Sequence, residues 1–421
     1  MTDTIFALSS GLPPAGIAVI RISGPAAGSA VIALAGKLPP SRRATLARFA
    51  DPHSRVVLDN ALLLWFPGPA SVTGEDLAEL HLHGGRAIVA AVLDALGRID
   101  GLRPATAGEF TRRAFENGRI DLAEAEGLAD LLAAETEGQR QSALALAEGA
   151  LGRQVGLWQT QLLRASALVE ATLDFSDESD VGEGTAYRDL LVELVETLAG
   201  LLASPPAERL KDGVRVVMAG PPNSGKSSLF NRLIDRDGAI VSEIAGTTRD
   251  RIEAPVVIAG VPLLLIDTAG LRTETEDVIE AIGIARTGEA IAAADIILWL
   301  GEGNQTPGGA LLVAAKADLG AGREGLPVSV ITGEGVEALK QAIITRAKAL
   351  LPKPGALALN ARHRSILAAA HTELSAALAS EDDLIAAEHL RFARAQLDAI
   401  TGKSGVEDML DALFGAFCIG K

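Results

Sequence analysis

The sequence predicts a multidomain α/β protein: an N-terminal α+β domain, an all-helical domain, and an inserted domain with a mixed, mostly parallel sheet that has helices on both faces. Three changes of pattern predict this organisation. Short apolar strands alternate with helical stretches up to about residue 118, and Ala/Leu/Glu-rich helical sequence follows. Apolar strands then return before helical character resumes near residue 361. The predicted domains are residues 1–118, 119–210, 211–345 and 346–421, the second and fourth being halves of the helical domain.

Turn signals and periodicity place the elements of the N-terminal domain. Residues 17–22 and 61–66 are apolar runs of strand length, and residues 87–96 have a helical pattern. Segments rich in Gly, Pro and His separate them and are typical of turns. This alternation predicts the α+β class of the domain.

Two sets of apolar residues recur at helical spacing, one on each side of the inserted domain. They are Leu122, Ala125, Leu128, Ala129 and Leu132, and then Leu390, Ala393, Leu397 and Ile400. Pro205 and Pro206 interrupt the first helical half. Ser404 and Glu407 have the spacing of a capping box, which predicts the start of the last helix.

Composition limits the possible partners and compartments. The chain has 421 residues, a net charge of −16 and a pI near 4.9, so most of its surface repels nucleic acid and any RNA contact must be local or supplied by a partner. Its single cysteine, Cys418, excludes an intrachain disulfide. The first residues lack a basic signal-peptide region, and no apolar run reaches about 18 residues. We therefore expect a cytoplasmic protein with no membrane contact.

Residues 220–227, Gly-Pro-Pro-Asn-Ser-Gly-Lys-Ser, form a complete phosphate-binding loop, or P-loop. An apolar strand precedes the loop and a helix follows it, which is the context that the motif requires. Backbone N–H groups of such a loop surround phosphates, Lys226 reaches the β and γ oxygens, and the Ser227 hydroxyl ligates Mg²⁺. The predicted phosphate-binding residues are Asn223, Ser224, Gly225, Lys226, Ser227 and Ser228.

Further motifs follow in the order that a Ras-like P-loop GTPase domain requires. Thr248 lies in a polar segment suited to a switch loop and is placed to ligate Mg²⁺. Asp267 ends an apolar strand, and Asp318 can accept hydrogen bonds from guanine N1 and N2, which adenine cannot supply. The predicted GTP-binding set also includes Ser242, Glu243, Ile244, Ala245, Gly246, Thr247, Thr268, Ala269, Gly270, Ala315, Lys316, Ala317, Ser329, Val330 and Ile331.

The residue that commonly orients the attacking water is absent from its usual place. A Gln often follows the Asp-x-x-Gly motif, but here Leu271 follows it, and Leu cannot polarise water. The acidic segment behind it offers four carboxylates, and local charge alone does not choose among them. They are Glu274, Glu276, Asp277 and Glu280.

Motifs in every region resemble those of the MnmE (TrmE) family of tRNA modification GTPases. Besides the P-loop and the motifs that follow it, the matching segments are residues 21–24, 73–76, 79–85, 108–115, 117–122 and the terminal Phe-Cys-Ile-Gly-Lys at 417–421. The terminal pentapeptide combined with a P-loop is highly specific.

The resemblance implies K⁺-activated GTP hydrolysis in which two nucleotide domains associate across the nucleotide. K⁺ then takes the place of an arginine finger and stabilises charge on the phosphates. By motif, the K⁺ ligands are Asn223 of the P-loop with Ser242, Ile244 and Thr247 of the first switch. The water-orienting carboxylate of the family matches Glu280, which is thereby the predicted catalytic residue.

The resemblance also implies a tetrahydrofolate derivative, 5-formyl- or 5,10-methylene-tetrahydrofolate, bound at a homodimer of N-terminal domains. Arg21, Glu79, Arg119 and Lys421 match the family's folate contacts, although the family usually has Lys where Arg119 stands. Glu79, His81 and His83 share one strand face, which suggests either a metal site or, more commonly, a polar strand edge. Cys418 has two interpretations: inert packing, or a catalytic cysteine near the folate.

The function that the resemblance implies is modification of the wobble uridine of certain tRNAs. The expected partner is a flavoprotein of the MnmG (GidA) type, which supplies FAD, uses NADH and forms a heterotetramer with the homodimer. The product is an aminomethyl or carboxymethylaminomethyl group at uridine C5. Two alternatives remain open from the residues: a ribosome-assembly GTPase of the Era/Der type, and a GTP-switched helical scaffold.

Overall fold

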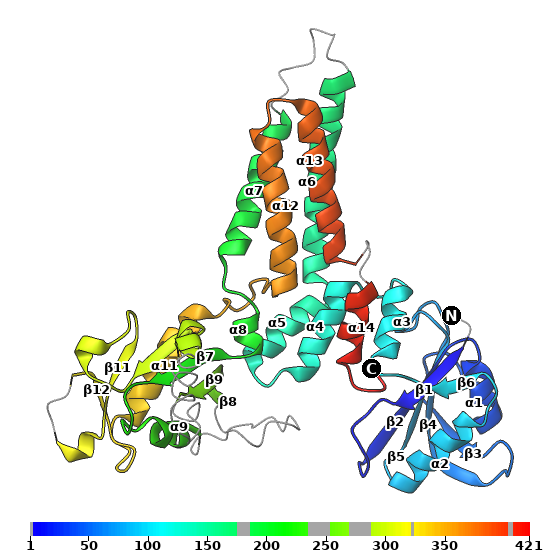
Figure 1. Cartoon of the computed structure of the whole chain (residues 1–421). Helices are drawn as coiled ribbons and strands as arrows, with labels where there is room; N and C mark the ends of the chain where they lie inside the picture. The colour runs from blue at the N-terminus through cyan, green and yellow to red at the C-terminus, as the bar shows by residue number, and fades with distance from the viewer. Residues whose placement is uncertain (1–2, 175–185, 235–252, 269–287, 321–323, 403–406) are drawn as a thin grey trace, which may run out of the picture. The chain divides into compact units, whose positions relative to one another are not determined.

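The computed structural model describes residues 3–174, 186–234, 253–268, 288–320, 324–402 and 407–421 (Figure 1). The chain forms two compact units, which are described separately. The first contains Met1–Ala129, Ala147–Val155 and Asp398–Lys421. The second contains Asp130–Leu146 and Gly156–Leu397.

A six-stranded sheet with the strand order β3-β4-β5-β2-β1-β6 forms the centre of the first unit. All its strand pairs are antiparallel except β1 with β6. The strands are β1 (Thr4–Leu8), β2 (Ile17–Ser23), β3 (Thr45–Ala50), β4 (Val57–Phe66), β5 (Leu77–His83) and β6 (Leu102–Pro104).

Two helices, α1 (Ala27–Ala35) and α2 (Arg86–Gly97), cover one face of this sheet. Their Val31 and Val92 pack in one core with Ile20, Leu80 and the fully buried Phe49. Alternation along β2 and β5 sends the intervening side chains to the opposite face, because successive strand residues point to opposite sides. The opposite face therefore carries the polar side chains that the sequence singled out.

The C-terminal residues pack into the same unit. The helices α3 (Glu109–Glu116), α4 (Leu122–Ala133) and α14 (Glu407–Gly415) share a small apolar core built around Leu122, Phe414 and Phe417. Beyond α14, Ile419 pairs with Ala107 in an isolated β-bridge. The backbone N–H of Phe110 then donates to the carbonyl of Lys421 at 3.2 Å, so the last residue lies at the start of α3.

A fully buried arginine joins α3 to the sheet. Arg113 is bonded to the carboxylates of Asp3, Glu75 and Glu109 at 3.0–3.2 Å. Burial by itself would raise the pKa of Glu109, but hydrogen bonds from Arg103, the Thr106 backbone and Arg113 outweigh it and bring the pKa to about 2. The carboxylate of Glu109 therefore stays ionised in the folded state.

We expect Arg113→Met to lower the free energy of unfolding by about 3 kcal/mol, because it removes the buried cation that Glu75 and Glu109 share. The matched control is Arg112→Met. Arg112 pairs with Glu116 and Asp411 at the surface, where such pairs contribute roughly 1 kcal/mol or less. Urea unfolding followed by circular dichroism measures both variants. Equal losses would contradict a special role for the buried network.

The helical part of the second unit contains long helices with one buried stripe each. They are α5 (Glu137–Ala147), α6 (Ala150–Asp174), α7 (Ala186–Ala203), α12 (Ala361–Ala379) and α13 (Asp383–Ile400), although the start of α6 and the ends of α5 and α13 belong to the first unit. Helix α7 packs along α12 (Figure 1). The Tyr187 hydroxyl donates to Asp383 at 3.0 Å, and His389 pairs with Glu373 at 2.7 Å, which ties α13 to both.

By length and composition alone, one described segment, Tyr187–Lys211, could cross a membrane. Its helix α7 nevertheless has an amphipathic character. Tyr187, Leu191, Leu194 and Leu198 are at most 1% exposed and lie on one helical face. One face of α7 therefore packs within this unit, while only 17% of the apolar window is buried.

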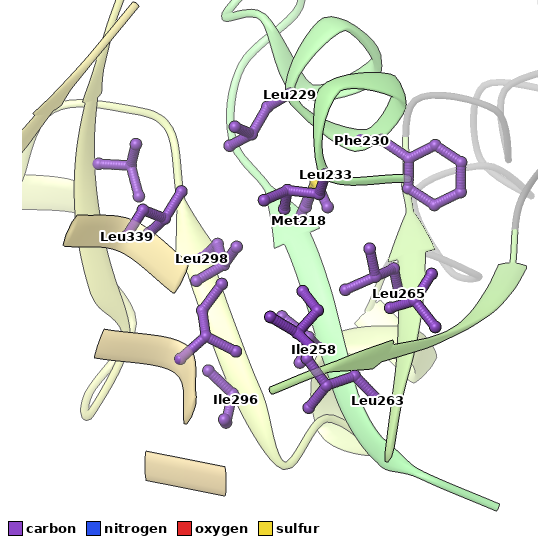
Figure 2. Close-up of a cluster of buried hydrophobic side chains, with 14 of the residues drawn as sticks. Met218, Leu229, Phe230, Leu233, Ile258, Leu263, Leu265, Ile296, Leu298 and Leu339 are labelled. Carbon is purple, nitrogen blue, oxygen red and sulfur yellow. The ribbon is translucent and has the colours of Figure 1, made fainter. Parts of the chain in front are cut away.

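The second unit also holds a six-stranded sheet with the order β12-β11-β10-β7-β9-β8, parallel except for the β8–β9 pair. Its strands are β7 (Val214–Ala219), β8 (Glu253–Ile258), β9 (Val261–Asp267), β10 (Ile296–Trp299), β11 (Leu311–Ala315) and β12 (Leu326–Val328). Helices α9 (Lys226–Ile234) and α11 (Val336–Leu350) pack on it. Figure 2 shows Leu229, Phe230 and Leu233 of α9 over strand residues such as Met218 and Leu265. The mixed, mostly parallel sheet confirms the predicted class.

One short helix and two 3₁₀ turns lie in the described connections: α8 (Glu208–Lys211), η1 (Gly303–Gln305) and η2 (Ala317–Leu319). The connection from β10 to β11 contains only η1 among its regular elements. Parallel strands usually take a crossover helix, so this connection is unusually short.

Most of the predicted elements are confirmed, and one residue of the predicted helical faces is wrong. The apolar strand expected before the P-loop is β7, and the apolar strand expected to end at Asp267 is β9. Leu390, Ala393, Leu397 and Ile400 are fully buried. Leu132, in contrast, is 50% exposed, because it lies in the last turn of α4, beyond the core at Leu122. Of the predicted capping box only Glu407, where α14 begins, is described.

Candidate functional site

The P-loop joins the carboxyl end of β7 to the first turn of α9. Gly220 has φ +142°. A Cβ at this position would lie only 2.9 Å from the carbonyl oxygen of Leu300, the residue that follows β10. Gly225 has φ +104° and Asn223 has φ +57°, both in the left-handed region. Glycine adopts such angles freely and asparagine tolerates the left-handed helical region better than most residues, which accounts for the residue types of the motif.

Lys226 lies inside this loop. Its side chain is 6% exposed, and Nζ donates to the carbonyls of Gly220 at 3.0 Å and Pro221 at 2.8 Å. The ammonium group is therefore held across the loop, beside the N-terminus of α9. The hydroxyl-bearing Ser227 and Ser228 follow in the first turn and are exposed, whereas the Ser224 hydroxyl is buried without a hydrogen-bond partner. A helix N-terminus with a buried lysine favours bound phosphate.

The carboxyl end of β9 lies beside the strand that enters the P-loop. Asp267 pairs in register with Met218, and its side chain is 4% exposed. The Thr268 hydroxyl donates to the Met218 carbonyl at 2.8 Å, which fixes the end of β9. A carboxylate thus lies near the first turn of α9, where the predicted Mg²⁺ ligand Ser227 is found.

Several predicted residues lie outside the described part of the chain. They are Ser242, Glu243, Ile244, Ala245, Gly246, Thr247, Thr248, Ala269, Gly270, Leu271 and Glu280. Their roles remain predictions.

The residues predicted to read the base follow β11. Asp318, in η2, accepts a 2.6 Å hydrogen bond from the hydroxyl of Ser329, which is fully buried after β12. The backbone N–H of Thr332 in turn donates to Ser329 Oγ at 3.1 Å. Ser329 therefore orients the carboxylate, while the neighbouring Ile331 is 84% exposed.

A contact that the motif analysis did not predict links the base-reading segment to the P-loop. Lys316 has φ +62°, and its Nζ donates to the carbonyl of Asn223 at 2.8 Å. Ala315, where the guanine motif usually has Asn, is buried, and its Cβ lies 3.8 Å from the Cβ position of Gly225. Alanine has no side-chain amide, so the lysine provides the side-chain bond between these two loops.

A cavity of about 510 Å³ borders this part of the site. Its walls come from the P-loop, the ends of β10 and β11, and Glu324. Asp318, Ser329 and Lys226 do not line it. Asn223, Ser224, Ala315 and Lys316, which belong to the predicted nucleotide-binding set, do line the cavity, so it overlaps part of the predicted site.

The polar face of the N-terminal sheet brings two predicted folate contacts together. Arg21 Nε donates to Glu79 at 2.9 Å, and His81 Nε2 lies 3.1 Å from the other oxygen of Glu79. Burial opposes ionisation of Glu79, but the hydrogen bonds from His81 and Arg21 outweigh it and hold the pKa of Glu79 below its usual value. The face thus presents an ionised carboxylate between a guanidinium group and an imidazole ring.

The strand that carries these residues is not a strand edge. β5 lies between β4 and β2, so the interpretation of the His-x-His pattern as a polar edge is wrong. His83 is bonded instead to Asp59 of β4 through Nδ1 at 2.8 Å, a partner that the sequence did not reveal. In the described residues, no group of three or more His, Cys, Asp or Glu side chains converges as metal ligands.

The remaining predicted residues lie near α3 and the chain end. Arg119 lies beside Gly74, in the loop that precedes β5. A Cβ added at Gly74 would lie 3.3 Å from the Cγ of Arg119. Cys418 is exposed, and its carbonyl accepts from the Lys421 backbone at 3.2 Å. No described contact joins Arg119, Cys418 or Lys421 directly to Arg21 and Glu79.

Comparison with known proteins assigns every region of the chain. A family model described as GTP-binding protein TrmE N-terminus matches residues 4–119, and one described as MnmE helical domain matches residues 122–418. The chain is 57% identical to the tRNA modification GTPase MnmE of Rhizorhabdus wittichii, covering 100% of this chain and 97% of the relative. It is 56% identical to that of Novosphingobium aromaticivorans, with both chains fully covered.

Among solved structures, the FeoB G domain from Methanococcus jannaschii matches with a TM-score of 0.24 and 23% identity. The match covers 32% of this chain and 98% of that chain. The G domain of the T. maritima FeoB iron transporter matches with the same TM-score, 26% identity and the same coverage.

Proposed function

The chain belongs to the MnmE family of tRNA modification GTPases, and we propose that its GTP hydrolysis is activated by K⁺ and by association of two copies. As a member of this family it binds GTP and acts in tRNA modification. The observation that supports the proposed nucleotide site is the P-loop with Lys226 held across it and Asp267 at the neighbouring strand end.

The residues of the P-loop fit the two cations that the proposal requires. Ser227 offers an exposed hydroxyl and Asp267 a carboxylate, which are the oxygen ligands that Mg²⁺ prefers. Asn223 is exposed and is held in a left-handed conformation beside Lys316, so its amide oxygen is available to a second cation. K⁺ bound there would stabilise negative charge that develops on the phosphates.

The chain's own residues position the nucleotide in this proposal. The backbone N–H groups of the loop and Lys226 bind phosphate, and Asp318, held by Ser329, accepts from guanine. Thr248, and Glu280 as the group that orients water, complete the site as predictions from the family motifs.

We also propose that residues 1–118 bind a tetrahydrofolate derivative and form the homodimer. The Arg21–Glu79–His81 group supports folate binding, since a carboxylate, a guanidinium and an imidazole suit a ligand with hydrogen-bonding ring nitrogens and glutamate carboxylates. On the same face Ile17 is 62% exposed and Leu62 is 43% exposed, which supports burial against a second copy.

The proposed reaction is addition of an aminomethyl or carboxymethylaminomethyl group to C5 of the wobble uridine of certain tRNAs in the cytoplasm. The folate supplies the methylene carbon, and a flavoprotein of the MnmG type supplies FAD and uses NADH. Hydrolysis of GTP drives association of the domains at 211–345 and does not form bonds on the base.

Calorimetric titration with 5-formyl-tetrahydrofolate tests the folate proposal. The wild type should bind, and Glu79→Gln should weaken binding, while GTP hydrolysis stays unchanged. His83→Gln is the matched control, because His83 lies on the same face but pairs with Asp59. Absence of binding by the wild type would refute the folate proposal and leave the GTPase assignment intact.

We expect Asp318→Asn to shift base preference from guanine toward xanthine, because the amide donates where the carboxylate accepted. The change should exceed tenfold in relative affinity, since an unpaired polar group costs roughly 1–3 kcal/mol. Ala315→Asn should instead tighten GDP binding several-fold by restoring an amide near the P-loop. Titration with GDP, XDP and ADP measures both variants. Comparable binding of ADP and GDP by the wild type would contradict the role of Asp318.

A further inference from the structure

Positive charge in this acidic chain is concentrated at one edge of the N-terminal sheet. Residues 1–118 contain eleven Lys and Arg against ten Asp and Glu, whereas the whole chain carries a net charge of −16. The remaining 303 residues therefore carry −17, although residues 346–421 among them are neutral, with nine Lys and Arg against nine Asp and Glu. Within it, five basic residues and one acidic residue lie between positions 37 and 57, namely Lys37, Arg42, Arg43, Arg48, Arg55 and Asp51.

The fold arranges three of these arginines along strand β3. This strand is at the end of the sheet order, so only β4 pairs with it. Arg43 lies just before the strand, Arg48 within it and Arg55 in the turn after it, and all three are exposed. Because a strand rises about 3.4 Å per residue, the three span on the order of 20 Å or more. We call Arg43, Arg48 and Arg55 the β3 basic edge.

The charges of this edge are not neutralised locally. Among the described residues, none of the three arginines pairs with a carboxylate, whereas Arg21, Arg98, Arg103, Arg112 and Arg113 of the same domain all do. The one acid of the segment, Asp51, is 7% exposed and accepts from the backbone N–H groups of His53 and Ser54. The edge therefore faces solvent as a row of free guanidinium groups.

We propose that the β3 basic edge binds the phosphate backbone of tRNA. A row of exposed arginines attracts the phosphates of RNA. Because the net charge of the chain is strongly negative, such a local positive surface is where RNA can bind it. The only phenyl ring of the segment, Phe49, is fully buried, so the edge has no phenyl group on which a base could stack. It contacts the backbone and carries no base sequence information. The proposal rests on direct contact of tRNA with this chain and does not depend on folate or K⁺.

The test is binding of a fluorescein-labelled tRNA transcript to the full-length chain, followed by anisotropy between 50 and 200 mM KCl. We expect Arg43→Gln/Arg48→Gln/Arg55→Gln to weaken binding at least tenfold at the lowest salt. The dependence of the logarithm of the association constant on the logarithm of the salt concentration should become less steep by about 2, because each lost phosphate contact removes on the order of 0.7–0.9 from the slope.

The matched control removes three exposed cations elsewhere, by Arg164→Gln/Lys348→Gln/Arg394→Gln. It changes net charge equally and should leave the affinity and the slope nearly unchanged. K⁺-stimulated GTP hydrolysis should be normal in both variants, which shows that both are folded.

Three results would overturn the proposal. Equal losses in the two variants would assign binding to net charge alone. Absence of tRNA binding by the wild type at the lowest salt would exclude the contact, even if modification with the flavoprotein proceeds. Dissociation of the edge variant into monomers in sedimentation would make this edge, with its 74% exposed Leu46, an interface between two copies.

Discussion

Replacing KCl with NaCl at equal ionic strength is expected to lower the turnover of GTP by on the order of 100-fold. Leu271 stands where many GTPases have the water-orienting Gln, so the chain depends on other groups for transition-state stabilisation. An arginine finger contributes about 10³–10⁵ in turnover, and a cation beside Asn223 would replace part of that effect. Phosphate release at saturating GTP measures it.

A single substitution separates cation binding from water activation. Glu280→Ala should reduce turnover by about 10²–10⁴ and leave GTP affinity nearly unchanged, as expected for removal of a catalytic carboxylate. Glu274→Ala, six residues earlier in the same acidic segment, is the control and should remain active. Equal rates in KCl and NaCl would exclude K⁺ activation, whereas a normal rate for Glu280→Ala would assign the role to another carboxylate.

Cys418→Ser is expected to block tRNA modification in a system reconstituted with the flavoprotein, while K⁺-stimulated GTP hydrolysis survives. The thiol is exposed in a tail that is fixed by the Ala107–Ile419 bridge and by the Phe110–Lys421 hydrogen bond. An exposed thiol is available for chemistry, and serine occupies nearly the same volume. Quantification of modified nucleosides by mass spectrometry measures the effect.

Two controls distinguish loss of chemistry from loss of the tail. Deletion of residues 418–421 should block modification as strongly as Cys418→Ser. Ile419→Ala tests the tail alone, because Ile419 is 63% exposed and its backbone, not its side chain, forms the bridge. Full modification by Cys418→Ser would reduce the cysteine to a packing role.

Strand and helix positions followed closely from the sequence because their signals are local. The run 214–219 reads as a strand and is one, since a buried parallel strand is apolar along most of its length. The prediction failed at Leu132 because periodicity describes the face of a helix but not where the neighbouring core ends.

In the nucleotide site too, the local features followed from the sequence and the long-range contact did not. The P-loop is eight consecutive residues, and its left-handed angles at Asn223 and Gly225 follow from the residue types. The Lys316–Asn223 hydrogen bond joins residues 93 positions apart, and no spacing rule anticipates it. It exists because β11 lies two strands from β7 in the sheet, so that the loops after both strands meet at the same edge.

The sequence by itself therefore determined the family, the fold class and the chemistry of each motif, since these depend on residue types at short spacing. Only the tertiary structure decided which motifs share a surface. In the structure Arg21 bonds Glu79, His83 bonds Asp59, and the chain end lies at the start of α3. Three exposed arginines also lie along the β3 edge of the sheet. The physical reason is that strand order and register set these distances, and both result from packing of the whole domain.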